Sequence, residues 1–204
     1  MKINGQELYE QLRAKHPIFI YDDFDCVFIN KQLQIRFTFI LGEKLYFRPT
    51  HLISLPDNWD DNAINNSLFR NLVFNLGMAE LISYWKASCS PELVIRPAFL
   101  NQDQIAFWKK LFLHGLGEFF YVNGIKPDED FISFSIAGSE VFNKASFIEK
   151  GHDRVLVPVG GGKDSAVSLE VLSGIRDCVP YIMNPRPASL GWYQKRCCIV
   201  TNSS

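Results

Sequence analysis

A glycine turn at residues 160–165 holds the residue types best suited to chemistry in this chain. The turn reads Gly-Gly-Gly-Lys-Asp-Ser and follows an apolar run, residues 155–159, that predicts a buried parallel strand. Glycines let a ligand approach the main chain, and free amides at the start of a helix attract phosphate. We expect that helix to begin near Ala166, with Asp164 or Ser165 as its N-cap. The turn is therefore a candidate phosphate-binding site.

Two familiar phosphate loops do not fit this turn. A Walker A loop requires G-x-x-x-x-G-K-[ST], but here Asp164 follows the glycine-lysine pair and Val157 stands where the first glycine belongs. A dinucleotide fingerprint requires G-x-G-x-x-G, but Ser165 occupies the position of its third glycine. A glycine-rich turn with no ligand is the alternative reading, although three glycines cost backbone entropy unless something needs close approach.

The turn resembles the S-G-G-x-D-S loop of the ATP pyrophosphatase (PP-loop) superfamily, with Gly160 in place of the first Ser. Enzymes of that superfamily split ATP between the α and β phosphates and activate a substrate as an adenylate. The resemblance implies ATP and Mg²⁺ as cofactors, Asp164 as a metal ligand, and Asn184 near the adenine. The ATP-binding residues that it implies are Gly160, Gly161, Gly162, Lys163, Asp164, Ser165 and Asn184.

The chain before the turn predicts a mixture of helices and strands. Apolar periodicity and turn residues predict the following elements. They are helices at 6–15, 67–87 and 101–121, an antiparallel meander at 18–48, loop at 54–66, and short strands at 93–96 and 131–136. We therefore expect an α+β N-terminal domain over residues 1–150.

Residues 154–183 predict one β-loop-α-β unit, the opening of a PP-loop α/β domain over residues 151–204. A doubly wound sheet needs several parallel strands that are covered on both faces. Residues 191–204 show little helix or strand pattern. We therefore expect this second domain to be incomplete and the chain to be truncated within it.

Composition limits the remaining possibilities. The chain has 204 residues and a net charge of -1, so it carries no electrostatic footprint for a nucleic-acid partner. Five cysteines at scattered spacings favour reduced thiols over a disulfide framework or a zinc site. No apolar run reaches the length of a membrane span, and residues 1–8 lack a signal-peptide pattern. We expect a cytoplasmic protein with no nucleic-acid or membrane partner.

A wider resemblance covers most of residues 20–190. Three segments carry it: residues 76–86 (LGMAELISYWK), 108–121 (WKKLFLHGLGEFFY) and 157–165 (VPVGGGKDS). Together they resemble the N-terminal part of the UDP-N-acetyl-alpha-D-muramoyl-L-alanyl-L-glutamate epimerase family. The resemblance implies ATP-dependent conversion of the terminal L-Glu of UDP-N-acetylmuramoyl-L-Ala-L-Glu to D-Glu through an acyl-adenylate, in peptidoglycan precursor synthesis.

Other polar residues give weaker signals. His114 and Glu118 stand four apart and would share a helix face, as a metal or acid–base pair or as an ordinary polar pair. The sequence assigns no general base to remove the α-proton of the substrate. His152, which precedes the strand before the turn, is a speculative candidate for that role. Ordinary surface roles are the simpler reading of five further charged residues: Glu80, Lys86, Arg96, Arg186 and Arg196.

Two other functions fit the same sequence. A different PP-loop enzyme, an amide ligase or a tRNA-modifying enzyme, would also adenylate its substrate, although the net charge of -1 argues mildly against tRNA. An inactive truncated fragment would keep the N-terminal domain and lack ATP chemistry. Exchange of pyrophosphate into ATP separates an adenylating enzyme from an inert fragment.

Overall fold

The computed structural model describes residues 4–42, 45–55, 59–142, 153–183 and 199–203. The chain divides into two compact units. The first unit comprises Met1–Asp25, Arg36–Arg48 and Asn62–Lys144, and the second comprises Cys26–Ile35, Pro49–Asp61 and Ala145–Ser204. Helices and strands occur in both units, which confirms an α+β fold with a mixed sheet. The division of the chain at residue 150 stays a prediction.

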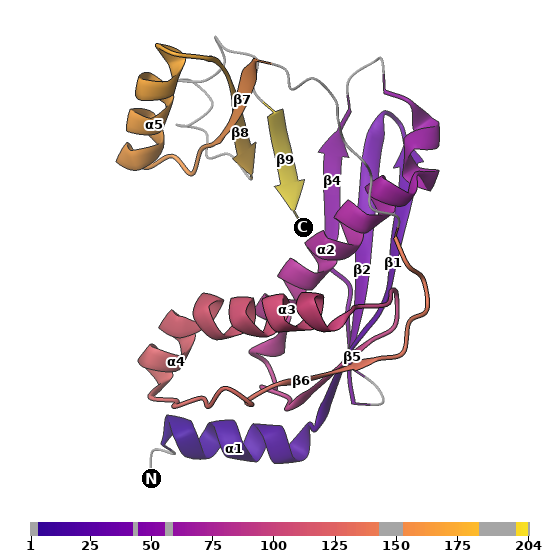
Figure 1. Cartoon of the computed structure of the whole chain (residues 1–204), viewed down its shortest axis with the longest axis vertical. Helices are drawn as coiled ribbons and strands as arrows, with labels where there is room; N and C mark the ends of the chain where they lie inside the picture. The colour runs from indigo at the N-terminus through magenta and orange to yellow at the C-terminus, as the bar shows by residue number, and fades with distance from the viewer. Residues whose placement is uncertain (1–3, 43–44, 56–58, 143–152, 184–198, 204) are drawn as a thin grey trace. The chain divides into compact units, whose positions relative to one another are not determined.

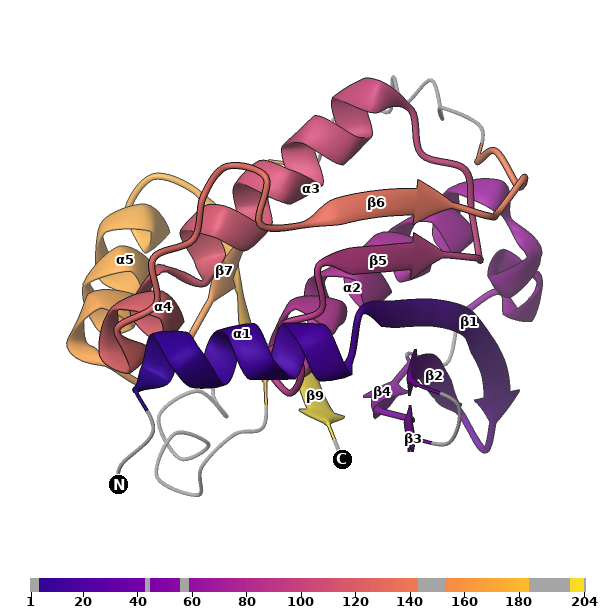
Figure 2. The same cartoon turned by 90° about the horizontal axis from the view of Figure 1, so that it is seen from below.

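The strands that lie wholly or partly in the first unit follow the order β6-β5-β1-β2, with β3 also paired to β2. Their bounds are Ile18–Ile29 for β1, Gln32–Leu41 for β2, Leu45–Phe47 for β3, Glu92–Ile95 for β5 and Ser133–Ile136 for β6. Strand β5 runs parallel to both β1 and β6, as the arrows in Figure 2 show. Strands β2 and β3 run antiparallel to each other. The predicted meander is therefore only partly right, because β1 also pairs in parallel with a strand some seventy residues later.

The helices of the first unit are α1 (Gly5–Lys15), α2 (Ser67–Trp85), α3 (Gln102–Gly115) and α4 (Gly117–Asn123), and an asparagine caps the N-terminus of each of the first three. The Asn66 side chain accepts a hydrogen bond from the Leu68 amide at 2.8 Å, as its position before α2 predicts. The predicted helix 101–121 is wrong in one respect, because it is divided at Leu116. The buried Leu116 lies between two glycines and leaves helical geometry.

Aromatic side chains fill the core of the first unit. Tyr21 on β1 stacks on Phe74 of α2, with ring centroids 5.7 Å apart. Gly77 permits this contact, because a Cβ there would lie 2.1 Å from the Tyr21 hydroxyl. Further along α2, Trp85 is fully buried, meets three phenyl rings edge-on, and donates its indole N–H to the Ser90 carbonyl at 2.8 Å. The close packing of α2 on the strands at Gly77 therefore depends on the absence of a side chain at that position.

Within the described residues, the second unit contains the strand order β4-β9-β8-β7 and the helix α5 (Lys163–Ser173) (Figure 1). Its strands are β4 (Thr50–Ser54), β7 (Arg154–Pro158), β8 (Asp177–Met183) and β9 (Ile199–Ser203). Strands β7, β8 and β9 are parallel, and β4 pairs antiparallel with β9.

Two expectations about irregular segments are corrected. Residues 191–204 were expected to lack strand pattern, but β9 forms there because its backbone pairs with both β8 and β4. The expected loop over 54–66 contains a 3-10 helix, Asp61–Asn65, and strand β4 precedes it. Local composition missed both strands because their hydrogen-bond partners lie far away in the sequence.

Within the residues that the structure describes, no helix has both the length and the apolar character needed to cross a membrane.

Candidate functional site

The candidate site lies in the second unit, where the chain leaves β7, turns through residues 159–162 and enters α5 (Figure 1). Strand β7 is held in parallel register with β8, and the Val159 amide extends that pairing by donating to the Tyr181 carbonyl at 2.8 Å. Behind the turn is a small apolar core of β7, α5 and β8 residues: Val157, Val159, Leu169 and Ile182. The turn is therefore anchored on both sides by regular structure.

The three glycines of the turn have different roles. Gly161 adopts φ +82°, a backbone conformation that L side chains rarely adopt. Gly162 is the N-cap of α5, with φ -89° and ψ 169°. A Cβ at Gly160 or at Gly162 would meet nothing within 4 Å, and both residues are exposed. The backbone at these two positions is thus open to close approach by a ligand.

The predicted N-cap is wrong. Helix α5 begins at Lys163 rather than near Ala166, and Gly162 caps it with no side-chain hydrogen bond. The Ser165 hydroxyl instead accepts a hydrogen bond from the Gly160 amide at 3.1 Å. Because that bond spans the turn, Ser165 holds the first and last residues of the turn together. In the sequence, the spacing of five residues between Gly160 and Ser165 was the only signal for this hydrogen bond.

The start of α5 has the features of an anion site. The first helical hydrogen bond of α5 runs from the Ala166 amide to the Gly162 carbonyl at 3.3 Å. The amides that precede Ala166 therefore have no helical acceptor, as at any helix N-terminus, and the helix dipole favours negative charge there. The side chains of Lys163 and Asp164 are exposed beside these amides. Backbone donors, an ammonium and a hydroxyl thus lie along one short stretch.

The described residues contain no group of three or more His, Cys, Asp or Glu side chains that could hold a metal ion. Asp164 alone offers one carboxylate in the turn. Mg²⁺ commonly binds through one or two carboxylates together with phosphate oxygens and water. A single aspartate therefore suits Mg²⁺ that arrives with a nucleotide better than an all-protein metal site.

The other candidate residues lie either outside the described residues or in the first unit. Asn184 lies outside the described residues, as do His152, Arg186 and Arg196. His114 and Glu118 fall in different helices, α3 and α4, so the premise that they share one helix face is wrong. Arg96 forms an ion pair with Asp22 at 2.5 Å on the surface of the first unit, which fits an ordinary surface role.

The fold and the turn define the class of protein: an α+β protein with a mixed sheet, in which a glycine turn joins a parallel strand to the start of a helix. A family model described as the MurL N-terminal domain matches residues 11–196. Since this match covers most of the chain, the chain belongs to the MurL N-terminal domain family.

Curated relatives carry one shared name, UDP-N-acetyl-alpha-D-muramoyl-L-alanyl-L-glutamate epimerase. The protein from Xanthomonas oryzae pv. oryzae (strain MAFF 311018) is 35% identical over 103 residues, which are 50% of this chain and 22% of the relative. The protein from Micromonospora sp. (strain ATCC 39149) is 36% identical over 106 residues, 51% of this chain and 23% of the relative. The matched part of the chain thus covers about a fifth of the length of these relatives. No solved structure matches the chain significantly.

Proposed function

We propose that this chain binds ATP at residues 160–165 and uses it to epimerise the terminal L-Glu of UDP-N-acetylmuramoyl-L-Ala-L-Glu to D-Glu. Membership of the MurL N-terminal domain family and the shared name of the curated relatives support the reaction. The observation that carries the ATP site is the open backbone at Gly160 and Gly162, immediately before the first amides of α5. The proposed setting is cytoplasmic synthesis of peptidoglycan precursors.

Activation of the α-carboxylate explains why ATP is needed. Removing the α-proton beside a carboxylate would add charge to a group that is already anionic. Attack of a carboxylate oxygen on the α-phosphorus of ATP releases pyrophosphate and gives an acyl-adenylate, in which that negative charge is gone. The α-proton is then lost to a base and a proton returns to the opposite face. Water finally cleaves the anhydride, which releases AMP and the D-Glu product.

The residues of the turn fit a triphosphate. The backbone amides of Gly161, Gly162 and the first turn of α5 would donate to phosphate oxygens, and the Ser165 hydroxyl and the Lys163 ammonium would add contacts. Asp164 would hold Mg²⁺, which lowers the charge on the phosphates. Gly160 replaces the Ser of the superfamily motif, so the hydroxyl in this turn comes from Ser165 alone.

The reaction is tested by chiral analysis of the glutamate after incubation of the 204-residue chain with the L-Glu substrate, ATP and Mg²⁺ in D₂O. We expect D-Glu that carries deuterium at Cα, together with AMP and pyrophosphate, and no product without ATP. Formation of AMP and pyrophosphate without D-Glu would contradict the proposal and indicate a different adenylating enzyme. No nucleotide turnover at all would also contradict it.

A further inference from the structure

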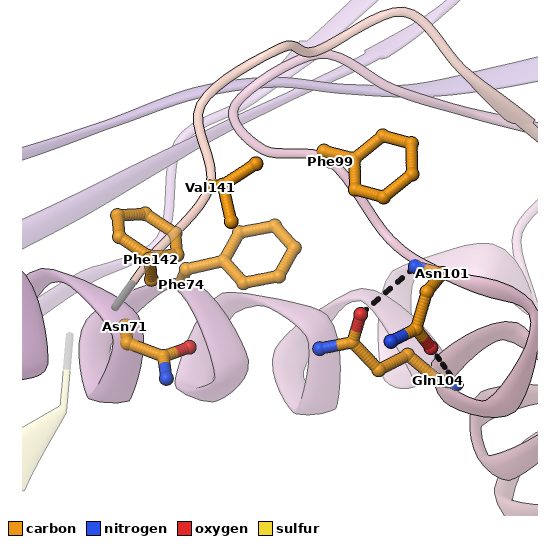
Figure 3. A pocket seen from close by; sticks show the side chains of 7 residues that line it. All are labelled: Asn71, Phe74, Phe99, Asn101, Gln104, Val141 and Phe142. Carbon is orange, nitrogen blue, oxygen red and sulfur yellow. Dashed lines mark hydrogen bonds between the residues drawn. The ribbon is translucent and has the colours of Figure 1, made fainter. Parts of the chain in front are cut away.

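A cavity of about 300 Å³ lies in the first unit, away from the glycine turn in the sequence (Figure 3). It is bordered by α2, by the start of α3 and by the segment that follows β6. Its lining combines three amide side chains with three phenyl rings and one valine: Asn71, Asn101, Gln104, Phe74, Phe99, Phe142 and Val141. The volume is at the lower end of small-molecule sites, and every lining residue is uncharged.

The amide oxygens around this cavity are already used by the protein. The Gln104 side-chain oxygen accepts from the Asn101 amide, and the Asn101 side-chain oxygen accepts from the Gln104 amide, both at 2.9 Å, as the dashed lines in Figure 3 show. This reciprocal capping box orients both side chains. The Asn71 side-chain oxygen likewise accepts from the Asn75 side chain at 2.8 Å.

The amide nitrogens of the same side chains are left for a ligand. Within the described residues, no hydrogen bond is donated by the side-chain NH₂ groups of Asn71, Asn101 or Gln104. Figure 3 shows the amide nitrogen of Gln104 on the side that faces Asn71 across the cavity. An NH₂ group is a donor only, so the cavity favours carbonyl or hydroxyl oxygens as partners.

Phenyl rings form the rest of the cavity wall. Hydrogen bonds fix the segment after β6, which carries Phe142. Phe142 packs on the buried Phe74, with ring centroids 5.8 Å apart. The Phe99 amide donates to the Glu140 carbonyl at 2.8 Å, and the Glu140 carboxylate accepts from Arg70 at 3.2 Å. The charges of Arg70 and Glu140 thus offset each other, while Phe99 itself is 48% exposed. Flat apolar surfaces therefore lie beside the amide donors.

We propose that this cavity binds an uncharged ring that presents carbonyl oxygens to the amide donors and a flat face to the phenyl rings. The inference rests on the proposed function, because that substrate contains two such groups. Its uracil is a flat ring with two carbonyl oxygens, and its N-acetylated sugar presents an acetamido carbonyl together with a C–H face that can pack on phenyl rings. Phosphate and carboxylate groups are poorer occupants, since the cavity lining offers no net positive charge to offset their desolvation. The cavity then holds the uracil or the N-acetylated sugar of the substrate, and the charged diphosphate between them stays out of it.

Titration of the full 204-residue chain with uridine and, separately, N-acetylglucosamine tests the inference by ligand-observed NMR without ATP. Gln104→Glu keeps the oxygen that caps α3 and removes the NH₂ donor, so folding is retained. We expect at least one probe to bind and Gln104→Glu to weaken it about fivefold or more. The matched control is Gln102→Glu, which adds the same charge to the same helical turn outside the cavity and should bind as wild type does.

Comparing the two probes shows whether the cavity binds the uracil or the N-acetylated sugar. Cytidine is a control for uridine, because an amino donor replaces one of the two carbonyl groups of the base. Binding of neither uridine nor N-acetylglucosamine would overturn the inference, as would binding that Gln104→Glu and Gln102→Glu change equally. The result of the probe-binding experiment can be distinguished from the result of the epimerisation assay. Probe binding without formation of D-Glu would leave the cavity assignment standing, whereas D-Glu formation without probe binding would overturn the cavity alone.

Discussion

At the scale of single residues, Gly161 supplies the left-handed backbone of the glycine turn, and the hydrogen bond from the Gly160 amide to the Ser165 hydroxyl closes it. The run of three glycines before Lys163 correctly indicates a backbone that needs unusual angles and open space, and the structure assigns these needs to different glycines. The N-cap was mispredicted because propensity favours Asp or Ser there. A contact between Ser165 and the Gly160 amide, which no local preference encodes, decides the geometry instead.

Gly160→Ala tests whether the open backbone serves a ligand. A Cβ at this position meets no protein atom within 4 Å, so the free energy of unfolding should change by less than about 0.5 kcal/mol. If phosphate approaches the turn closely, ATP affinity measured by calorimetry should fall about tenfold, the equivalent of one lost charge-assisted hydrogen bond. Gly174→Ala, at the far end of α5, is the control. Unchanged ATP affinity in Gly160→Ala would count against the phosphate site.

Cys89 predicts a pH dependence of stability. Burial raises the pKa of this thiol from 9.0 to about 11, with a smaller opposing effect of Arg13, and only 1% of the residue is exposed. The raised pKa means that the folded chain keeps a proton that the unfolded chain loses. The contribution of the protonated thiol to the free energy of unfolding is therefore complete below about pH 9. It is lost as the pH rises toward 11, and the total loss is up to about 3 kcal/mol.

Urea unfolding at pH 8 and at pH 10.5 measures this effect. The wild-type chain should lose more stability between the two values than Cys89→Ala does, because alanine has no proton to lose. Burial also raises the pKa of Tyr9, but that tyrosine is present in both chains and its direct effect largely cancels in the comparison. Equal losses in the two chains would show that the Cys89 thiol does not titrate in the expected range.

At the scale of elements, helices were predicted better than strands. Caps and apolar periodicity are local signals, so α1 and α2 lie close to their predicted bounds. Strands β4 and β9 were missed because each exists through pairing with a segment remote in the sequence. The division of the predicted helix 101–121 follows from Gly115 and Gly117, which weaken helical structure on both sides of a buried leucine.

Gly77→Ala tests the packing of α2 on β1. A Cβ at this position would lie 2.1 Å from the Tyr21 hydroxyl and 2.8 Å from the Phe37 ring, so one of the elements must shift. We expect a net loss of about 1–3 kcal/mol in the free energy of unfolding despite the better helix propensity of alanine. Gly117→Ala at the start of α4 meets nothing within 4 Å and should be neutral or stabilising. A stabilised Gly77→Ala chain would contradict the close contact.

At the scale of the whole molecule, the cavity between α2 and the start of α3 could not be predicted from the sequence. Its lining comes from α2, the start of α3 and residues 141–142, which are separated by up to about seventy positions and meet only in the folded unit. The spacing of Asn101 and Gln104 was the one readable signal, because it matches a capping box. The α+β class was predictable because long amphipathic and alternating segments report on the architecture without knowledge of their partners.

Exchange of radiolabelled pyrophosphate into ATP tests the central claim most directly. With the 204-residue chain, Mg²⁺ and UDP-N-acetylmuramoyl-L-Ala-L-Glu, we expect exchange that requires the dipeptide substrate. The rate should fall in Gly160→Ala and remain in Gly174→Ala, because only the first change obstructs the open backbone of the turn. Absence of exchange with the wild-type chain, or exchange that is indifferent to both the dipeptide and Gly160→Ala, would contradict the assignment of residues 160–165 as the ATP site of an adenylating epimerase.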